Sequence, residues 1–388
     1  MRRETDRGSV IYVGRVYLPS EGAPGKRVYN VAQCLRESGF TVKLACLSRA
    51  MASDYQEIDG LHYFRTRRLD RNGSRLAAAV YWLSGRYERT AEWLNEALNT
   101  DTKGIVAYGG SSPQLIQISR VAKRFGVPVV PDIVEWDVAA PVLSLPWLDL
   151  EVRQRAVVPA LGKAISISRV MRDYFLRRGC KAIHVPPIVR VAEADGPGAA
   201  RSSAGRGVRL LFSGSPNRER HDAIIAGCEE IARHGLSVEL IYCGTPTEEI
   251  ARIATTREEG FRISAVGRLS EDDYADLIRA VDAGIIVRDD RKWSRSCFPS
   301  KVPEFLSVGT PVLCSRVGDL RWVVRDGREG FTFEGASAAG LASAIMSLAR
   351  LSAQQRRALS ESCRSRALQL FDSRRWRDPI SNYIDSLR

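Results

Sequence analysis

One short segment of the sequence combines a serine, a lysine and a glutamate at spacings that could bind a phosphate-bearing ligand. Ser300, Lys301 and Glu304 fall at the start of a helix expected at 301–308, after an expected strand at 284–287. Ser300 could cap this helix, whose free N–H groups would attract an anion, and Lys301 adds a positive charge. A carboxylate at Glu304 could accept two hydrogen bonds from a ribose diol. The segment predicts a nucleoside diphosphate pocket, although an ordinary capped helix with a surface lysine and glutamate has the same pattern.

Other motifs for phosphate, dinucleotide or metal binding are incomplete. The run 22–27 lacks the first glycine of a phosphate-binding loop and the Ser or Thr that should follow its lysine. No Gly-x-Gly-x-x-Gly follows the first expected strand, no Asp-x-Asp occurs, and the four histidines lack zinc-binding spacing. We therefore expect no metal and no other cofactor, with any nucleotide acting as a substrate.

The length and composition fit a protein with two folded domains. The chain has 388 residues, of which 44% are hydrophobic and 27% are charged, enough for a normal core in each half. No apolar run approaches the ~20 residues of a membrane-spanning helix, and the short apolar run near the N-terminus is unlike a signal peptide. The eight cysteines are scattered through apolar patterns, which is typical of reduced thiols. These features favour a cytoplasmic protein.

The net charge of +13 suits phosphate-bearing substrates, nucleic acid or an anionic membrane surface. Solvated arginines on an ordinary surface explain it equally well. The tightest basic cluster lies between Arg169 and Lys181, on an expected helix that also carries Tyr174 and Phe175. A solvated helix face is the first interpretation of this cluster, and peripheral contact with the inner face of an anionic membrane is the alternative. We expect no nucleic acid partner.

Short β-branched runs alternate with amphipathic stretches along the chain, which predicts parallel sheets covered by helices on both faces. The expected strands are 9–13, 41–47, 104–108, 127–130, 163–168, 181–185, 208–212, 237–242, 261–266, 284–287, 311–314 and 330–333. The expected helices are 26–38, 75–98, 113–125, 147–161, 169–178, 219–234, 246–258, 271–282, 301–308, 319–325, 338–350, 353–371 and 374–387. Ligands of such sheets bind at the carboxyl ends of the strands.

A run of small residues at 191–207 divides this pattern into two halves and is typical of a linker. We therefore expect an α/β protein with two Rossmann-like doubly wound domains that face each other across a cleft. Residues 1–190 would form the first domain, and 208–371 the second domain, which contains the predicted nucleoside diphosphate pocket. The last segment, 372–388, would be a terminal helix, with packing back on the first domain as one option.

The segment that begins at Cys297 resembles a pattern of the GT-B glycosyltransferases of the retaining family 4 type. The matching positions are Pro299, Ser300, Lys301, Glu304, Phe305, Leu306, Gly309, Pro311 and Val312. Further matches follow at Gly318 and over 324–330, and strand-to-loop landmarks match at 212–214, 242–244 and 265–268. The first half agrees more loosely, through 22–28 and 129–132. The resemblance implies the GT-B fold and the transfer of a sugar from a nucleotide-diphosphate sugar.

The resemblance also implies roles for residues of the second half. Glu304 corresponds to the family's ribose-binding glutamate, and the loop after Gly214 corresponds to its diphosphate loop. The family's arginine is absent directly after this glycine, so Arg218 and Arg220 would supply the missing charge. Together with Lys301, they would stabilise the departing diphosphate, which is catalysis by electrostatic stabilisation.

Other positions follow from the same resemblance. Ser296 stands where relatives carry an acid that contacts the donor sugar, and the main chain near Gly267 and Arg268 would choose the base. In the first half, Asp132 takes the place of a catalytic-side histidine, and Gly22 begins the loop that belongs to the donor site. The implied acceptor is a glycan or a lipid-linked sugar, with a role in the synthesis of envelope polysaccharide.

Two other classes of function remain open from the sequence. The nucleotide-sugar 2-epimerases share the fold, but they rely on several acids and histidines in the cleft, and this chain has only four scattered histidines. A non-catalytic basic protein that binds nucleic acid or acts as a scaffold would account for the charge and for Ser296. Nucleotide binding would separate the transferase from this last class.

Overall fold

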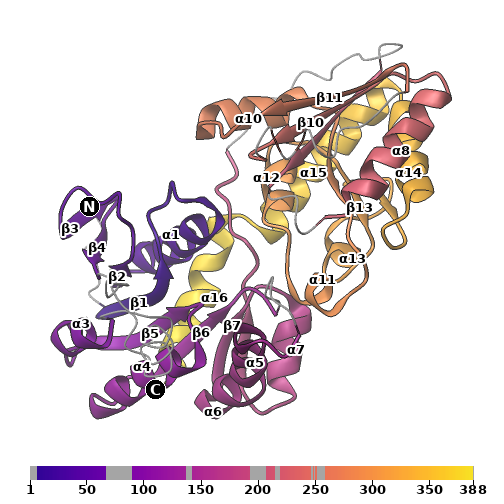
Figure 1. The fold of residues 1–388 in the computed structure, drawn as a ribbon. Helices are drawn as coiled ribbons and strands as arrows, with labels where there is room; N and C mark the ends of the chain where they lie inside the picture. Colours follow the sequence, from indigo (N-terminus) through magenta and orange to yellow (C-terminus); the bar gives the residue numbers. More distant parts are fainter. Residues whose placement is uncertain are drawn as a thin grey trace. The chain divides into compact units, whose positions relative to one another are not determined.

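The computed structural model describes residues 7–66, 90–136, 142–192, 207–214, 219–245, 248, 250 and 258–387. The chain forms two compact units. The first comprises Met1–Ile188 together with Ser373–Arg388, and the second is Val189–Asp372. In Figure 1 the C-terminal helix, in yellow, lies among the indigo and purple elements of the first unit. The first unit is therefore built from two separate stretches of the sequence.

The first unit contains a sheet in which eight strands pair in the order β3-β4-β2-β1-β5-β6-β7-β8. All of these pairings are parallel except that of β3 with β4. The strands are β1 (Ser9–Val16), β2 (Thr41–Cys46), β3 (Tyr55–Ile58), β4 (Leu61–Arg65), β5 (Thr102–Tyr108), β6 (Val129–Ile133), β7 (Lys163–Ser166) and β8 (Lys181–His184). The central strand β1 is buried on both faces, because Val10 and Tyr12 enter one core cluster while Ile11 and Val13 enter another.

Helices cover both faces of this sheet. They are α1 (Gly22–Glu37), α3 (Thr90–Ala97), α4 (Ser112–Arg124), α5 (Leu145–Val152), a π-helical segment (Arg153–Val157), α6 (Val158–Leu161), α7 (Arg169–Leu176) and α16 (Ser373–Asp385). The hydroxyls of Ser111 and Ser168 cap α4 and α7 by accepting from the backbone N–H groups of Gln114 and Met171. Helices α1 and α16 pack together over one face.

The second unit contains a six-stranded parallel sheet in the order β11-β10-β9-β12-β13-β14. Its strands are β9 (Val208–Ser213), β10 (Val238–Cys243), β11 (Phe261–Val266), β12 (Ala283–Ile286), β13 (Val312–Ser315) and β14 (Gly330–Phe333). Along the chain, β10 and β11 are added on one side of β9, and β12, β13 and β14 are then added on its other side. The gap between the ends of β9 and β12 is therefore the topological switch point, where open α/β sheets bind ligands.

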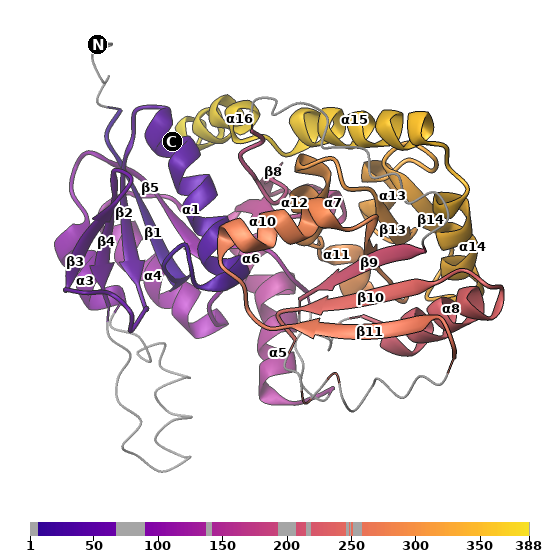
Figure 2. The ribbon, with the colours of Figure 1, turned by 90° about the horizontal axis from the view of Figure 1, so that it is seen from above.

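The helices of the second unit also lie on both faces of its sheet (Figure 2). They are α8 (His221–Arg233), α10 (Glu271–Ala280), α11 (Lys292–Ser296), α12 (Lys301–Ser307), α13 (Leu320–Val323), α14 (Ala338–Ala349) and α15 (Ala353–Leu370). Helix α14 packs on α8, and α15 packs on α12. A capping box of Ser352 and Gln355 begins α15.

The expected class, a doubly wound α/β protein of two Rossmann-like units, is confirmed. The expected helix 75–98 is described only from Thr90, and 246–258 lies mostly outside the described residues. The hairpin formed by β3 and β4 was not predicted from the sequence. Its turn is Asp59–Gly60, with φ of 49° and 75°, and Asp-Gly is the sequence that favours such a two-residue turn. The signal was therefore present in the sequence.

The chain passes between the units at Ile188–Val189 and again at Asp372–Ser373. The first passage comes slightly before the expected linker 191–207, of which 193–206 lie outside the described residues. Within the second unit the two passages are joined, because the N–H of Val189 donates to the carbonyl of Phe371 at 2.9 Å. The N–H of Val191 donates to a carboxylate oxygen of Asp372 at 3.2 Å.

A pH dependence of stability follows from His184 on β8. Burial lowers the pKa of His184 to about 4, and Arg169 and Arg172 act in the same direction. The unfolded chain takes up a proton near pH 6.5, so this contribution to stability is present above about pH 6.5 and is lost as the pH falls toward 4. We expect acidification to lower the melting temperature of the wild type more than that of His184→Gln. If the melting temperatures of the wild type and His184→Gln fell by the same amount between about pH 7 and about pH 5, this prediction would be wrong.

Candidate functional site

Three glycines line the carboxyl edge of the second sheet, one after each of β9, β10 and β11. The N–H of Gly214 donates to the carbonyl of Cys243 at 3.1 Å, and the N–H of Gly244 donates to the carbonyl of Gly267 at 3.2 Å. The hydroxyl of Thr245 donates to the carbonyl of Gly214 at 2.9 Å. The structure therefore brings the predicted residues Gly214 and Gly267 to one edge, held by a continuous set of backbone hydrogen bonds.

Lys301 and Glu304 of α12 lie at the same edge. The Lys301 ammonium is 2.9 Å from a carboxylate oxygen of Glu304 and 4.4 Å from the centre of the Tyr274 ring on α10. Burial and the nearby Glu304 carboxylate raise the pKa of Tyr274. Burial also raises the pKa of Cys243 at the end of β10, against the opposing effect of Lys301. A cation and a carboxylate are thus placed beside the glycine turns.

The prediction that Ser300 caps this helix is wrong. Ser300 has helical dihedrals (φ −62°, ψ −16°), and its side chain makes no capping hydrogen bond. A capping serine needs an extended backbone so that its hydroxyl can reach the N–H groups of the first turn. Because α12 is only 7 residues long, the positive charge in this part of the site comes chiefly from the Lys301 side chain.

Two arginines form ion pairs at the switch point between β9 and β12. Arg288, two residues after the end of β12, donates from Nε to Glu219 at 2.7 Å, and both side chains are largely buried. Arg220 pairs with Asp289 at 2.8 Å and with Asp222 at 2.6 Å, and its N–H donates to the carbonyl of Val287. Arg220 is therefore held at the end of β12 with its side chain partly exposed, whereas the predicted Arg218 lies outside the described residues.

Ser296 and Arg268 have different surroundings. Ser296 ends α11 and is only 2% exposed, and its hydroxyl donates to the carbonyl of Trp293 at 3.1 Å. This short helix therefore turns inward the side chain that stands at the position predicted to contact the donor sugar. Arg268 is exposed after β11 and next to Gly267, at the edge where the base was expected.

In the first unit, the structure places Asp132, which the sequence predicted to be catalytic, in a buried ion pair. Asp132 ends β6 and has no exposed surface, and its carboxylate accepts from Arg27 at 3.0 Å and 2.6 Å. Another nitrogen of Arg27 donates to the carbonyl of Val185 at 3.1 Å. Burial opposes the charge of Arg27, but Asp132 outweighs burial and raises the pKa of Arg27. The pair joins α1, β6 and the segment after β8.

The predicted donor-site residue Gly22 begins α1 with a φ of 79°, a conformation that favours glycine. The same turn contains a closer constraint at Gly25, where a Cβ would lie 2.0 Å from the carbonyl oxygen of Leu18. The loop before α1 therefore approaches the helix so closely that only glycine fits. This close approach shapes the carboxyl edge of β1.

Sequence reasoning missed Tyr274, the Glu219–Arg288 pair and Arg27. Their partners are far apart in sequence, so no local pattern could link them. Arg27 and Asp132, for example, are separated by four strands of the chain, β2 to β5, and meet only when the sheet forms. A charged residue soon after the end of a strand, such as Arg288 two positions after β12, was the available signal.

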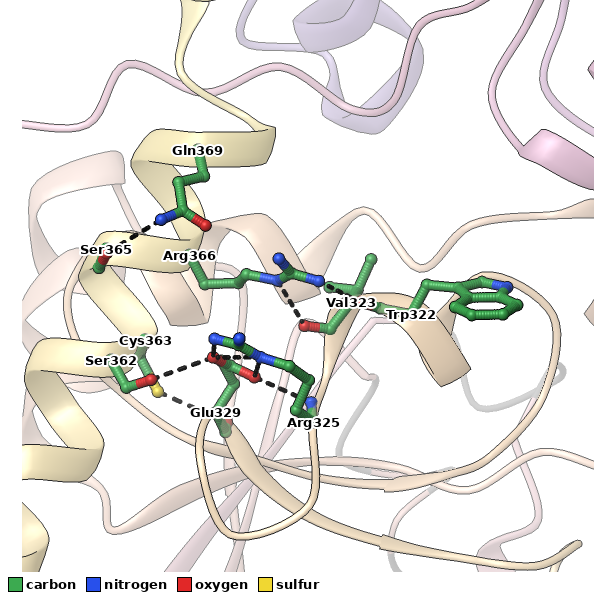
Figure 3. A network of polar contacts seen from close by, with 9 residues as sticks. All are labelled: Trp322, Val323, Arg325, Glu329, Ser362, Cys363, Ser365, Arg366 and Gln369. Carbon is green, nitrogen blue, oxygen red and sulfur yellow. Dashed lines mark hydrogen bonds and ion pairs between the residues drawn. The ribbon is translucent and has the colours of Figure 1, made fainter.

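The turn before β14, which belongs to the family pattern, is fixed to α15 by the polar network in Figure 3. Glu329 is fully buried and accepts from the backbone N–H of Arg325 at 2.8 Å and from the Ser362 hydroxyl at 3.0 Å. The Arg325 guanidinium also contacts this carboxylate. Arg366 of α15 donates to the carbonyl of Val323 at 3.2 Å. Glu329 therefore has a structural role.

We expect Glu329→Ala to lower the free energy of unfolding by about 1.5–3 kcal/mol, since hydrogen bonds to a charged group are lost. Burial raises the pKa of Glu329, but the hydrogen bonds from Arg325 and Ser362 outweigh it and lower this pKa overall. The matched control is Glu334→Ala, whose exposed carboxylate lies 3.6 Å from Arg316 and contributes little. Chemical denaturation of both variants measures the free energies of unfolding. Equal losses for Glu329→Ala and Glu334→Ala would contradict the prediction.

Comparison with known proteins identifies families in both units. A family described as "Glycosyl transferase 4-like domain" matches residues 22–188, and one described as "Glycosyl transferases group 1" matches residues 207–350. Among curated protein sequences, none matches the chain significantly.

Solved structures match over nearly the whole chain at low sequence identity. Sucrose-phosphate synthase from Thermosynechococcus elongatus has a TM-score of 0.69 and 16% identity, covering 98% of each chain. HepE from Anabaena, in complex with UDP and glucose, has a TM-score of 0.66 and 15% identity, covering 98% of this chain and 100% of that one. A trehalose-phosphate synthase from Burkholderia xenovorans, in complex with glucose-6-phosphate, has a TM-score of 0.67 and 15% identity, covering 97% of this chain and 100% of that one.

These matches share one fold with the two parallel-sheet units described above. The two family matches lie one in each unit and together account for more than half of the chain. The chain belongs to the GT-B glycosyltransferases of the family 4 type.

Proposed function

We propose that the enzyme is a retaining hexosyltransferase that uses a nucleotide-diphosphate sugar and needs no metal. The observation that carries the donor assignment is the pairing of Lys301 with Glu304 beside the turns after β9, β10 and β11. A carboxylate can hold the ribose diol while a lysine neutralises the diphosphate. The donor-bound structure of HepE, which contains UDP-glucose, supports the same class of donor.

In this proposal, Lys301 and Arg220 stabilise the negative charge that develops on the departing diphosphate. Such stabilisation is usually the largest single contribution to catalysis. Both cations are paired with carboxylates in the structure, Lys301 with Glu304 and Arg220 with Asp289. The incoming diphosphate would therefore replace these carboxylates as the partner of each cation, which frees Glu304 to bind the ribose.

We propose a glycan or a lipid-linked sugar as the acceptor, in the synthesis of envelope polysaccharide. The enzyme would act in the cytoplasm and at the inner face of the membrane. The basic cluster between Arg169 and Lys181 supports this location. Helix α7, the turn after it and the start of β8 carry exposed Arg169, Arg177, Arg178 and Lys181. No helix among the described residues is long and apolar enough to cross a membrane, so contact with a membrane would be peripheral.

The test is calorimetric titration with UDP, GDP and ADP, followed by incubation with the sugar conjugate of the nucleotide that binds. We expect one nucleotide to bind, and nuclear magnetic resonance to show that the transferred sugar keeps the anomeric configuration of the donor. Failure to bind any of the three would remove the donor assignment. An inverted product would remove the retaining mechanism, and activity that depends on an added divalent cation would contradict metal independence.

A further inference from the structure

An apolar ridge lies exposed on α5 and the residues just before it. Its members are exposed by 40–72% and consist of Val142, Leu143, Leu145, Leu148 and Val152. Leu145, Leu148 and Val152 share one face of the helix, since they are spaced by three and four residues. Leu143 adopts a left-handed backbone with φ of 68°, which is uncommon and costly for a leucine. A contiguous exposed apolar surface of this kind marks an interaction site.

The ridge is held at the carboxyl edge of the first sheet, next to the end of β5. The backbone N–H of Ser112 donates to the Asp149 carboxylate at 2.8 Å, and the Ser112 hydroxyl donates to the carbonyl of Asp149 at 3.0 Å. Arg153 reaches the carbonyl of Gly110, and Leu150 of α5 is buried. Helix α5 is therefore fixed by its other side, so the apolar ridge is a permanent part of the surface.

Basic side chains flank the ridge. The indole N–H of Trp136 donates to Glu151 of α5 at 2.9 Å, and the Trp136 ring lies 4.5 Å from that of Tyr174 on α7. The guanidinium of Arg178 lies 3.6 Å from the centre of the Tyr174 ring. This series of contacts joins α5 to the end of α7, where Arg177 and Arg178 are exposed.

We propose that the α5 ridge and the basic end of α7 together form a docking surface for an anionic lipid bilayer. The leucines would enter the boundary between head groups and acyl chains while the arginines contact the anionic head groups. A second copy of the chain fits less well, because a symmetric contact would bring the same arginines against each other. Docking would direct the carboxyl edge of the first sheet toward the membrane. This orientation rests on the proposed function, in which the acceptor is lipid-linked.

The experiment is flotation of the full chain with vesicles of phosphatidylcholine alone or mixed with phosphatidylglycerol. We expect the wild type to float with the mixed vesicles. We expect Leu145→Ser/Leu148→Ser to reduce its partition by roughly tenfold or more, because two apolar side chains are removed from the contact. Leu368→Ser is the matched control, since Leu368 is also exposed, by 44%, but lies on α15. It should float as the wild type does.

Arg177→Gln/Arg178→Gln should weaken flotation with the mixed vesicles and leave any binding to phosphatidylcholine unchanged. No flotation of the wild type, or equal flotation of the leucine variant and the wild type, would overturn the proposal. So would a dimer in sedimentation velocity that the leucine variant breaks, because the ridge would then be covered by a second copy. Nucleotide titration of the same variants should match the wild type, which separates this surface from the donor site.

Discussion

Glu304→Gln is expected to weaken nucleoside diphosphate binding by about ten- to a hundredfold. A hydrogen bond to a charged group contributes about 1.5–3 kcal/mol, and every 1.4 kcal/mol corresponds to a factor of ten in affinity. Glutamine keeps the shape of the side chain but loses the charge that would hold the ribose diol. It also removes the charge that pairs with Lys301 at 2.9 Å. Calorimetric titration of the nucleotide into the wild type and the variant measures the difference.

Lys301→Met is the control that separates the ribose from the diphosphate. We expect it to weaken diphosphate binding by a similar factor, and to leave binding of the corresponding nucleoside as in the wild type. Glu304→Gln should weaken binding of both ligands. Were Glu304→Gln to bind the diphosphate as tightly as the wild type, the donor pocket could not lie at the start of α12.

Asp132→Ala is expected to lower the free energy of unfolding by about 3–5 kcal/mol, the largest effect on stability that we predict. The change leaves the buried guanidinium of Arg27 without its carboxylate, and an uncompensated buried charge is costly. Arg27 side-chain exposure is 5% and that of Asp132 is 0%, so water cannot replace the lost partner. Chemical denaturation with extrapolation to water gives the difference.

The double variant Arg27→Met/Asp132→Leu tests the cause of this loss. It removes both charges together, so it should recover much of the stability that Asp132→Ala loses. If the double variant were no more stable than Asp132→Ala, packing at this position and not the unpaired charge would be responsible. Activity of the double variant would further show that Asp132 takes no part in the reaction.

The alternation of strands and helices was readable from the sequence because a buried parallel strand needs a nearly continuous apolar run, as in β1 and β10. The placement of Lys301 and Glu304 was also readable, because both residues follow a strand and begin a helix. The surroundings of Asp132 could not be predicted from the sequence, because its partner Arg27 is brought to it by the pairing of distant strands. The burial of Ser296 could not be predicted either, because burial on a five-residue helix depends on tertiary packing.

The return of α16 to the first unit determines which parts of the protein can fold independently. Ile380, Tyr383, Ile384 and Leu387 belong to the same core cluster as Val10 and Tyr12, and the Tyr383 hydroxyl donates to the carbonyl of Lys181 at 2.7 Å. The second unit is one uninterrupted stretch of chain, so all of it can emerge from the ribosome and fold before α16 is made. The first unit stays unfinished, with part of α1 uncovered, until α16 has been made. The half of the enzyme that is synthesised first is therefore the half that matures last.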